Sequence, residues 1–167
     1  DLIEAKRLFD QEASLLSALN HPNLPKVVDH FEESNRAFLV MEFIEGQSLQ
    51  QLLEEATYGL LETEVLGWMI QVCYVLDYLH NQQPPIIFRD LKPGNVMLSN
   101  NGMIKLIDFG IARLAKKQDR DVTHFDPVEL GAKSKAYATP EMMAEADPQP
   151  NDDVYGLSCV IYMLLTG

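Results

Sequence analysis

Asp90, Lys92 and Asn95 put an acid, a base and an amide at short fixed intervals directly after an apolar run. A second acid, Asp108, ends the pair of strand-like runs that follows, which an Asn-Gly turn joins. A hairpin brings its two ends together, so these side chains can converge. Two carboxylates and an amide oxygen are hard ligands that suit Mg²⁺, and the lysine adds a positive charge. Phosphoryl transfer needs this combination, because its transition state spreads negative charge over oxygens that must be positioned and neutralised.

Taken singly, each of these residues has a plain structural explanation, since Asp and Asn are common in turns and at helix caps. The order in which other short motifs follow them is more informative. The tripeptide DFG stands at 108–110, TPE at 139–141, and Asp153 opens an apolar helical segment. We therefore predict one phosphotransfer site to which several loops contribute.

Sequence periodicity predicts the elements that must hold these loops. Leucines at helical spacing, with Glu12 on or beside their stripe, predict a first helix that Pro22 ends. Strand-like runs at 26–31 and 36–43 are separated by a polar turn and predict a β-hairpin. A serine followed three places later by a glutamine, in SLQQ, predicts a capping box on a short helix.

Further along the chain, the pattern predicts two longer helices and a loop. Residues 62–81 should form a helix, and the run PIIF at 85–88 a strand. Residues 154–167 are apolar nearly all round, as in a helix in the middle of a larger core. The stretch 108–141 has little periodicity, which is typical of a functional or disordered loop. The apolar face of the helix at 62–81 is predicted to comprise Leu66, Met69, Ile70, Cys73, Leu76 and Leu79.

The composition favours a globular domain and argues against some partners. The chain has 167 residues, of which 47% are apolar, and 25 acidic against 13 basic side chains give a formal charge of −12. This charge repels nucleic acid and anionic membranes, so we expect no nucleic-acid partner and no membrane contact from this segment. Cys73 and Cys159 lie in apolar helical patterns, which predicts buried free thiols in a reducing, cytoplasmic compartment. The whole protein could still carry a membrane anchor outside this segment.

In this order, the motifs resemble those of the eukaryotic-like (Hanks-type) serine/threonine protein kinases, of the type that bacteria carry, along nearly the whole chain. The resemblance implies a partial α+β protein-kinase-like fold. Residues 1–44 would form the remainder of the N-lobe, a regulatory helix plus a β-hairpin, with the hinge. Residues 45–167 would form most of a mainly helical C-lobe. The glycine-rich loop and the ATP-binding lysine would precede Asp1, and more helices would follow Gly167, so we expect the fragment alone to be inactive.

The resemblance implies a role for each residue of the first group. Asp90 would accept the proton of the substrate hydroxyl, Lys92 would steady the transferring phosphate, and Asn95 and Asp108 would hold Mg²⁺. Residues 88–95, FRDLKPGN, would be the catalytic loop, and Asp153 would anchor this loop from the central helix, which is the apolar helical segment that Asp153 opens. The lysine two places after the catalytic acid marks kinases that use ATP to phosphorylate serine and threonine hydroxyls of proteins.

The resemblance also implies an ATP site between the hinge and the second hairpin. Glu12 matches the glutamate that pairs with the ATP-binding lysine; the alternative, which the pattern favours less, is a solvated helix residue. The residues expected at the adenine are Met41 as the gatekeeper, the backbone of Glu42, Phe43 and Ile44, and Met97 with its neighbours Val96 and Leu98.

The sequence departs from the family pattern at several places. Phe88 stands where most relatives have a histidine, and it should still stack on the phenylalanine of DFG. Gly94 stands where some relatives have a glutamate that binds a basic residue of the substrate, upstream of the phosphorylated site. We therefore expect no strong preference for basic substrates. Candidate phosphorylation sites in the long loop are Thr123, Ser134 and Thr139.

Two other functions remain open at this stage. One is a pseudokinase scaffold that binds nucleotide or a partner without transferring phosphate, which the presence of Asp90, Lys92, Asn95 and Asp108 argues against. The other is a small-molecule phosphotransferase of the aminoglycoside or choline type. Such enzymes lack both the lysine after the catalytic acid and the region from TPE to the central helix.

Overall fold

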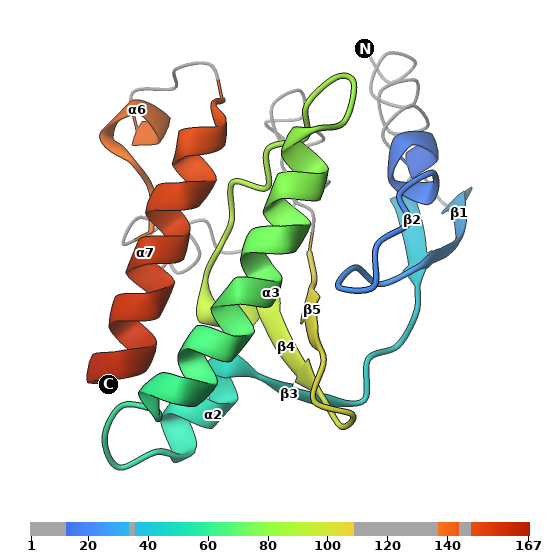
Figure 1. Ribbon diagram of the computed structural model, residues 1–167. Helices are drawn as coiled ribbons and strands as arrows, with labels where there is room; N and C mark the ends of the chain where they lie inside the picture. Colours follow the sequence, from blue (N-terminus) through green and yellow to red (C-terminus); the bar gives the residue numbers. More distant parts are fainter. Residues whose placement is uncertain (1–12, 34–35, 109–136, 144–147) are drawn as a thin grey trace.

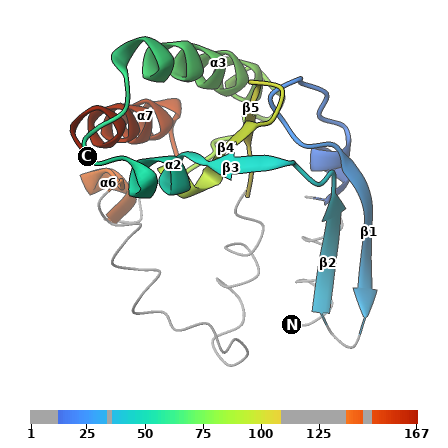
Figure 2. The ribbon, with the colours of Figure 1, turned by 90° about the horizontal axis from the view of Figure 1, so that it is seen from below.

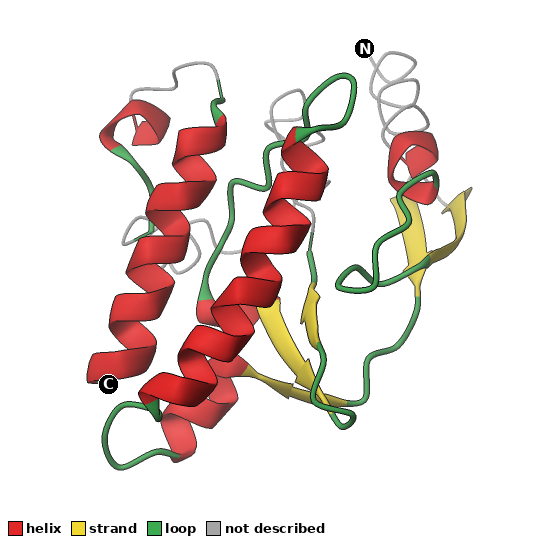
Figure 3. Cartoon of the chain, in the orientation of Figure 1, coloured by secondary structure: helices red, strands yellow, loops and turns green. Residues whose placement is uncertain are grey.

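The computed structural model describes residues 13–33, 36–108, 137–143 and 148–167 and has two small antiparallel sheets and several helices (Figure 3). This mixed content agrees with the predicted α+β, kinase-like fold. Residues 13–17 are helical, in agreement with the C-terminal part of the first predicted helix. In chain order the other elements are β1 (Val27–Glu33), β2 (Arg36–Met41), β3 (Gly46–Ser48), α2 (Leu49–Glu55), α3 (Glu62–His80), the 3₁₀ turn η1 (Pro93–Asn95), β4 (Val96–Ser99), β5 (Ile104–Leu106), α6 (Pro140–Met143) and α7 (Pro150–Thr166).

Both predicted hairpins are present, and each belongs to its own sheet. Strands β1 and β2 pair antiparallel, with Phe31 opposite Phe38. The second sheet has the order β3-β4-β5, and β4 and β5 are joined through the predicted Asn-Gly turn, in which Gly102 has a φ of +81°. Glycine adopts this left-handed conformation without strain, which explains the residue at this turn.

The core lies where α3 and α7 pack beside the β3-β4-β5 sheet, whereas the β1–β2 hairpin stands apart on one side (Figures 1 and 2). Helices α3 and α7 lie side by side in both views. Their facing side chains exclude water together with those of β4 and β5. The buried residues of this core include Val65, Val72, Val75, Leu79, Val96, Ile104, Leu106, Val160 and Leu164.

The short helix α2 begins with the predicted capping box. The Ser48 hydroxyl accepts a hydrogen bond from the Gln51 N–H at 3.2 Å, and the Gln51 side chain accepts one from the Ser48 N–H at 2.8 Å. These bonds satisfy two backbone donors that a helix start leaves unpaired. The sequence signal and the local geometry agree here.

The prediction for the buried face of α3 was wrong in part. Leu66 and Ile70 are about half-exposed and Cys73 is exposed, whereas Val65 and Val72 are fully buried. The helix has apolar residues on two adjacent stripes, so its period alone could not decide which stripe faces the core. Cys73 is consequently an accessible thiol, and Cys159 on α7 is only partly buried.

Two further predictions need correction. Residues 85–88 are not a strand, because their backbone groups bond to α3 and α7 instead of to a neighbouring strand; the Ile86 N–H, for example, donates to the Leu79 carbonyl at 3.0 Å. Helix α7 is not buried all round, since Val154 and Tyr162 are exposed while its opposite face packs on α3. Within the described ranges, no helix is long and apolar enough to cross a membrane.

Candidate active site

The structure brings Asp90, Lys92 and Asn95 together around one carboxylate oxygen. Lys92 Nζ lies 2.9 Å from Asp90 Oδ2, and the side-chain NH₂ of Asn95 donates to the same oxygen at 3.1 Å. That NH₂ group also donates to the Asp90 backbone carbonyl at 2.8 Å. The nitrogen end of the Asn95 amide is thus the end that contacts Asp90, and its oxygen is the atom of this side chain that could ligate a metal ion.

A short 3₁₀ turn sets the spacing between these three residues. The Asn95 N–H donates to the Lys92 carbonyl at 2.9 Å, which closes the turn η1. Pro93 occupies the first helical position, where its missing N–H is not needed and its fixed φ favours the turn. Asn95 itself is buried, so its side chain has little freedom to leave Asp90.

Asp153, at the start of α7, holds the catalytic loop because its side chain bonds to the backbone of that loop. Its carboxylate accepts hydrogen bonds from the Phe88 N–H at 2.9 Å and the Arg89 N–H at 2.7 Å. Arg89 has a φ of +66°, an unfavourable value for a residue with a side chain, and the bond to its N–H stabilises that conformation. The contact predicted between Asp153 and the catalytic loop is therefore present, and the residue is 1% exposed.

Asp108 is held near the catalytic loop by a hydrogen bond of the preceding residue, Ile107. The Ile107 N–H donates to the Asn95 carbonyl at 2.9 Å, so β5 leaves the sheet directly toward the catalytic loop. Asp108 is exposed and has a φ of +64°, which turns the chain sharply at this acid. Phe109, the expected partner of Phe88, lies outside the described residues, whereas Phe88 itself is buried in the core.

The donor chemistry of Asn95 and Asp108 fits Mg²⁺, which takes oxygen ligands and usually keeps several non-protein ligands. Among the described residues, no group of three or more His, Cys, Asp or Glu could hold a metal ion. A site with only two protein ligands is consistent with this finding, because phosphate oxygens and water complete the shell of such magnesium ions.

In the predicted hinge, which follows β2, Glu42 forms hydrogen bonds to residues before β1 and on β5. The Glu42 N–H donates to the Lys26 carbonyl at 2.8 Å, and its carboxylate accepts from the Lys26 N–H at 3.2 Å and from Lys105 Nζ at 3.4 Å. The bond from the Lys26 N–H and the charge of Lys105 lower the pKa of Glu42. Met41 is partly buried, Phe43 is 86% exposed and Ile44 is buried.

Strand β4 distinguishes between the three residues predicted under the adenine. Val96 belongs to the core and Leu98 packs against it, whereas Met97 is partly buried. Successive side chains of a strand point to opposite faces, so Met97 points away from the core that its two neighbours contact. Of the three, Met97 is therefore the one whose side chain stays a candidate for the predicted nucleotide site.

Thr139 was a candidate phosphorylation site, and its surroundings do not suit that role. Its hydroxyl is buried, donates to Asp152 Oδ1 at 3.0 Å and accepts from the Met142 N–H at 3.0 Å. A phosphoryl group there would bring negative charge against the buried carboxylate of Asp152.

Tyr137 lies two residues before Thr139, and burial together with the nearby Cys159 raises the pKa of its hydroxyl. The other candidates Glu12, Thr123 and Ser134 lie outside the described residues.

His80 was not among the residues that the sequence pattern singled out, and the structure gives it a specific partner. His80 Nε2 lies 2.7 Å from Asp153 Oδ2, the oxygen that also accepts the Phe88 N–H. The signal was available, because His80 follows buried Leu76 by four places and so extends the buried stripe of α3 with a polar residue.

Asn23 is a second residue that the sequence did not single out. Its side-chain NH₂ donates to the Ile104 carbonyl at 2.7 Å and to the Gln71 side chain at 3.0 Å, and its own carbonyl accepts the Leu106 N–H at 2.8 Å. These bonds join the loop before β1 to α3 and to β5. An asparagine between two prolines gives no indication of such a buried network.

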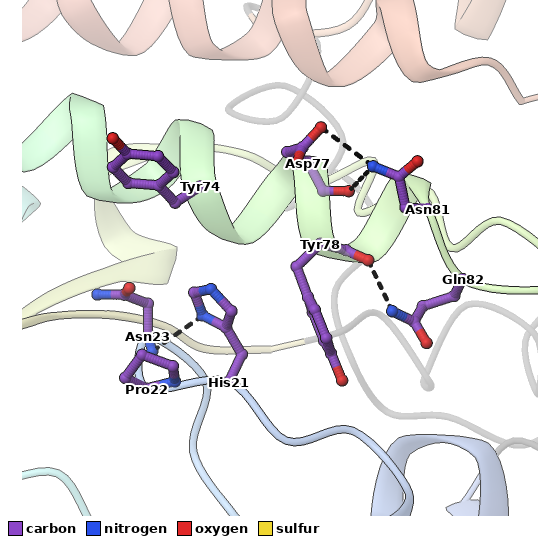
Figure 4. Close-up of a pocket in the computed structure, with 8 residues that line it drawn as sticks. All are labelled: His21, Pro22, Asn23, Tyr74, Asp77, Tyr78, Asn81 and Gln82. Atoms are coloured by element: carbon purple, nitrogen blue, oxygen red, sulfur yellow. Dashed lines mark hydrogen bonds between the residues drawn. The ribbon is translucent and has the colours of Figure 1, made fainter.

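A hollow of about 500 Å³ lies outside the predicted site, between this loop and the C-terminal half of α3 (Figure 4). In it, the His21 ring packs on Tyr78 with centroids 5.0 Å apart, and burial lowers the pKa of His21. None of its residues was a site candidate. They are His21, Pro22, Asn23, Tyr74, Asp77, Tyr78, Asn81 and Gln82.

Comparison with known proteins gives a consistent result. The family model described as "Protein kinase domain" matches residues 3–167. The chain is 35% identical over 161 residues to the serine/threonine-protein kinase PrkC of Bacillus subtilis (strain 168), covering 96% of this chain and 24% of that protein. It is 32% identical over 166 residues to the serine/threonine-protein kinase Nek5 of Homo sapiens, covering 98% and 22% respectively. The chain thus spans about a quarter of the length of these relatives. Since the family model covers nearly every residue, the chain belongs to the protein kinase family.

Proposed function

We propose that this chain forms part of a serine/threonine protein kinase that transfers the γ-phosphoryl group of ATP to serine and threonine hydroxyls of proteins. Protein kinases use ATP and a divalent metal ion, generally Mg²⁺. The observation that carries the proposal for this chain is the single Asp90 carboxylate oxygen that Lys92 and Asn95 both contact. An acid held between a cation and an amide is suited to accept a proton beside a phosphate.

In the proposed mechanism, the Asp90 carboxylate orients the acceptor hydroxyl and takes its proton as the oxygen attacks the γ-phosphorus. The bond from the γ-phosphorus to the oxygen that bridges it to the β-phosphate breaks in the same step, and ADP leaves. Lys92, now bonded to Asp90, would also contact the transferring phosphoryl group and offset its charge. Mg²⁺, held by Asn95 and Asp108, supplies neutralisation of the phosphate oxygens when it is bound. Asp153 and His80 keep the loop in place and do not touch the reactants.

For the nucleotide, we propose that the adenine lies between the hinge and Met97. The Glu42 N–H is already donated to Lys26, so recognition would fall to the Glu42 carbonyl and to the backbone of Phe43 and Ile44. Met41 would close the back of the site, and Glu12 would pair with a lysine beyond this chain. This arrangement divides the chain into a partial N-lobe with the hinge at 1–44 and a partial C-lobe at 45–167.

The proposal is tested by phosphate transfer from ATP and Mg²⁺ to a serine- and threonine-containing protein, with the complete protein that contains this chain. We expect Asp90→Asn to lower the rate by about 10²-fold or more, because the amide cannot accept the proton. Glu64→Gln, the same change at an exposed site on α3, serves as the matched control and should be without effect. Equal incorporation by Asp90→Asn and wild type would refute the assignment, and ATP binding without any transfer would favour the pseudokinase scaffold.

A further inference from the structure

The first turn of α7 carries two adjacent carboxylates, and only one of them serves the catalytic loop. Asp153 accepts the Phe88 and Arg89 N–H groups, as described above. Asp152 is also buried, at 7% exposed, but its carboxylate bonds to the segment that contains TPE. A buried carboxylate requires hydrogen bonds to offset its lost hydration, so both contacts are expected to be specific.

Thr139 is the partner of Asp152 and links two helices with one hydroxyl. The hydroxyl donates to Asp152 Oδ1 at 3.0 Å and accepts the Met142 N–H at 3.0 Å. It therefore caps the start of α6 and fastens that start to α7, beside which α6 lies in Figure 1. The other carboxylate oxygen of Asp152 accepts the Gln149 N–H at 3.0 Å, which fixes the acid at the beginning of α7.

One turn further along α7, Gly156 lies close to both the catalytic loop and the segment that contains TPE. A Cβ at this position would lie 3.3 Å from Leu91 Cβ and 3.8 Å from the Tyr137 carbonyl oxygen. Leu91 directly follows Asp90, and Tyr137 precedes Thr139 by two residues. Residues 137–139 consequently border the catalytic loop on the side of α7, whereas the residues proposed for the nucleotide belong to the hinge and β4.

We propose that Thr139 and Asp152 form a positioning pair that holds residues 137–142 beside the catalytic acid. Binding of the acceptor protein then depends on the bond between the two side chains, whereas binding of ATP does not. This inference rests on the proposed kinase function. The pair touches neither reactant. It acts by positioning the backbone of residues 137–142, which borders the place where the acceptor protein would bind. It differs in this respect from Asp153, which holds the catalytic acid itself.

The test uses the complete protein, ATP and the serine peptide that the wild type phosphorylates best in a peptide library. We expect Thr139→Val to raise the KM for the peptide at least about tenfold while the KM for ATP stays within about twofold, since one buried hydrogen bond is lost. Thr139→Ser keeps the hydroxyl and should stay within about twofold of wild type for both substrates. Asp152→Asn combined with Thr139→Val should be no worse than Thr139→Val alone, because the bond between the two side chains is already lost and the asparagine oxygen can still accept the Gln149 N–H.

Amide hydrogen exchange provides a readout that does not need activity. In Thr139→Val, exchange of the Met142 and Met143 amides should be faster, and exchange of the Phe88 and Arg89 amides should be unchanged, because Asp153 is untouched. An equal rise in both KM values, or unchanged peptide KM and unchanged exchange at 142–143, would overturn the proposal. If the wild type transfers no phosphate, the kinase function fails, whereas the exchange data still decide whether Thr139 holds this segment.

Discussion

Asp153 and Asp29 both accept hydrogen bonds from backbone N–H groups, but their surroundings are opposite. Asp153 is buried between α7, α3 and the catalytic loop, where it bonds to Phe88, Arg89 and His80. Asp29 lies exposed on strand β1 and accepts only the N–H of the next residue, at 2.8 Å, among the bonds described for its side chain.

The same contrast extends to the regions around them. The catalytic loop rests on the core of α3, α7 and the β3-β4-β5 sheet, to which Phe88 and Leu91 belong. In the β1–β2 hairpin, Phe31 and Phe38 stack on each other at 5.1 Å and remain 43% and 39% exposed. Local stability follows buried contacts, so we expect the part of residues 1–167 that carries Asp90 to unfold last and the hairpin to open first.

Replacing the two aspartates should break this comparison most directly. Asp153→Ala leaves two backbone N–H groups and His80 without their acceptor, and we expect it to lower the free energy of unfolding by about 3–5 kcal/mol. Asp29→Ala removes one exposed bond, and its effect should remain within about 0.5 kcal/mol. Urea unfolding of residues 1–167 measures both values. Similar losses for the two variants would show that the hairpin is as tightly built as the catalytic loop.

The two phenylalanines give a second test with the same side chain. Phe88→Ala empties a fully packed position, and we expect a loss of about 3–5 kcal/mol in unfolding free energy. Phe38→Ala removes one partner of an exposed ring pair, and the loss should be about 1 kcal/mol. Equilibrium unfolding followed by circular dichroism compares them. A loss at Phe38 that matches the loss at Phe88 would contradict a peripheral hairpin.

The predictability of the two regions differs in the same way. Local signals predicted both hairpins and the helix after Ser48, because the Asn-Gly turn and the capping box act within a few residues. The convergence of Asp90, Lys92 and Asn95 was also predictable, since one short turn sets their spacing. These features need no information from distant parts of the chain.

Features that depend on distant residues could not be predicted from residue patterns alone. The extended run at 85–88 has the composition of a strand, but its N–H groups bond to helices: the Phe88 N–H to Asp153, which lies 65 residues later, and the Ile86 N–H to the Leu79 carbonyl. The core-facing side of α3 is chosen by α7 and the sheet, so the period of the sequence could not assign Leu66 or Val72. The partners of His80 and Thr139 are likewise set by the place at which α7 packs.

Asn23 joins the two regions, and its replacement should have an intermediate effect. Asn23→Ala removes the side-chain donor to the Ile104 carbonyl and one of two donors to the Gln71 side-chain oxygen, which still accepts the Ile104 N–H. The loss should lower the unfolding free energy by about 1–3 kcal/mol. Asn20→Ala, at an exposed position in the same loop, is the matched control and should change it by less than about 0.5 kcal/mol. Thermal and urea unfolding report the loss. Equal values for Asn20→Ala and Asn23→Ala would argue against a buried link between loop and sheet.

Glu42 gives the smallest expected effect and the one most specific to the proposed hinge. The Lys26 N–H and the Lys105 ammonium lower its pKa in the folded protein below the ordinary value of 4.5, so the folded state favours the charged form. The resulting stabilisation is present above that ordinary value and is lost as the pH falls through the lower, folded pKa. Wild type should therefore exceed Glu42→Gln in stability at neutral pH, and the difference should vanish in acid. Urea midpoints across this range measure it, with Glu45→Gln as a matched charge change in the same hinge. Because Glu42 is solvated and its ion pair with Lys105 is 3.4 Å long, added salt should also shrink the difference, whereas the cost of Asp153→Ala should be insensitive to salt.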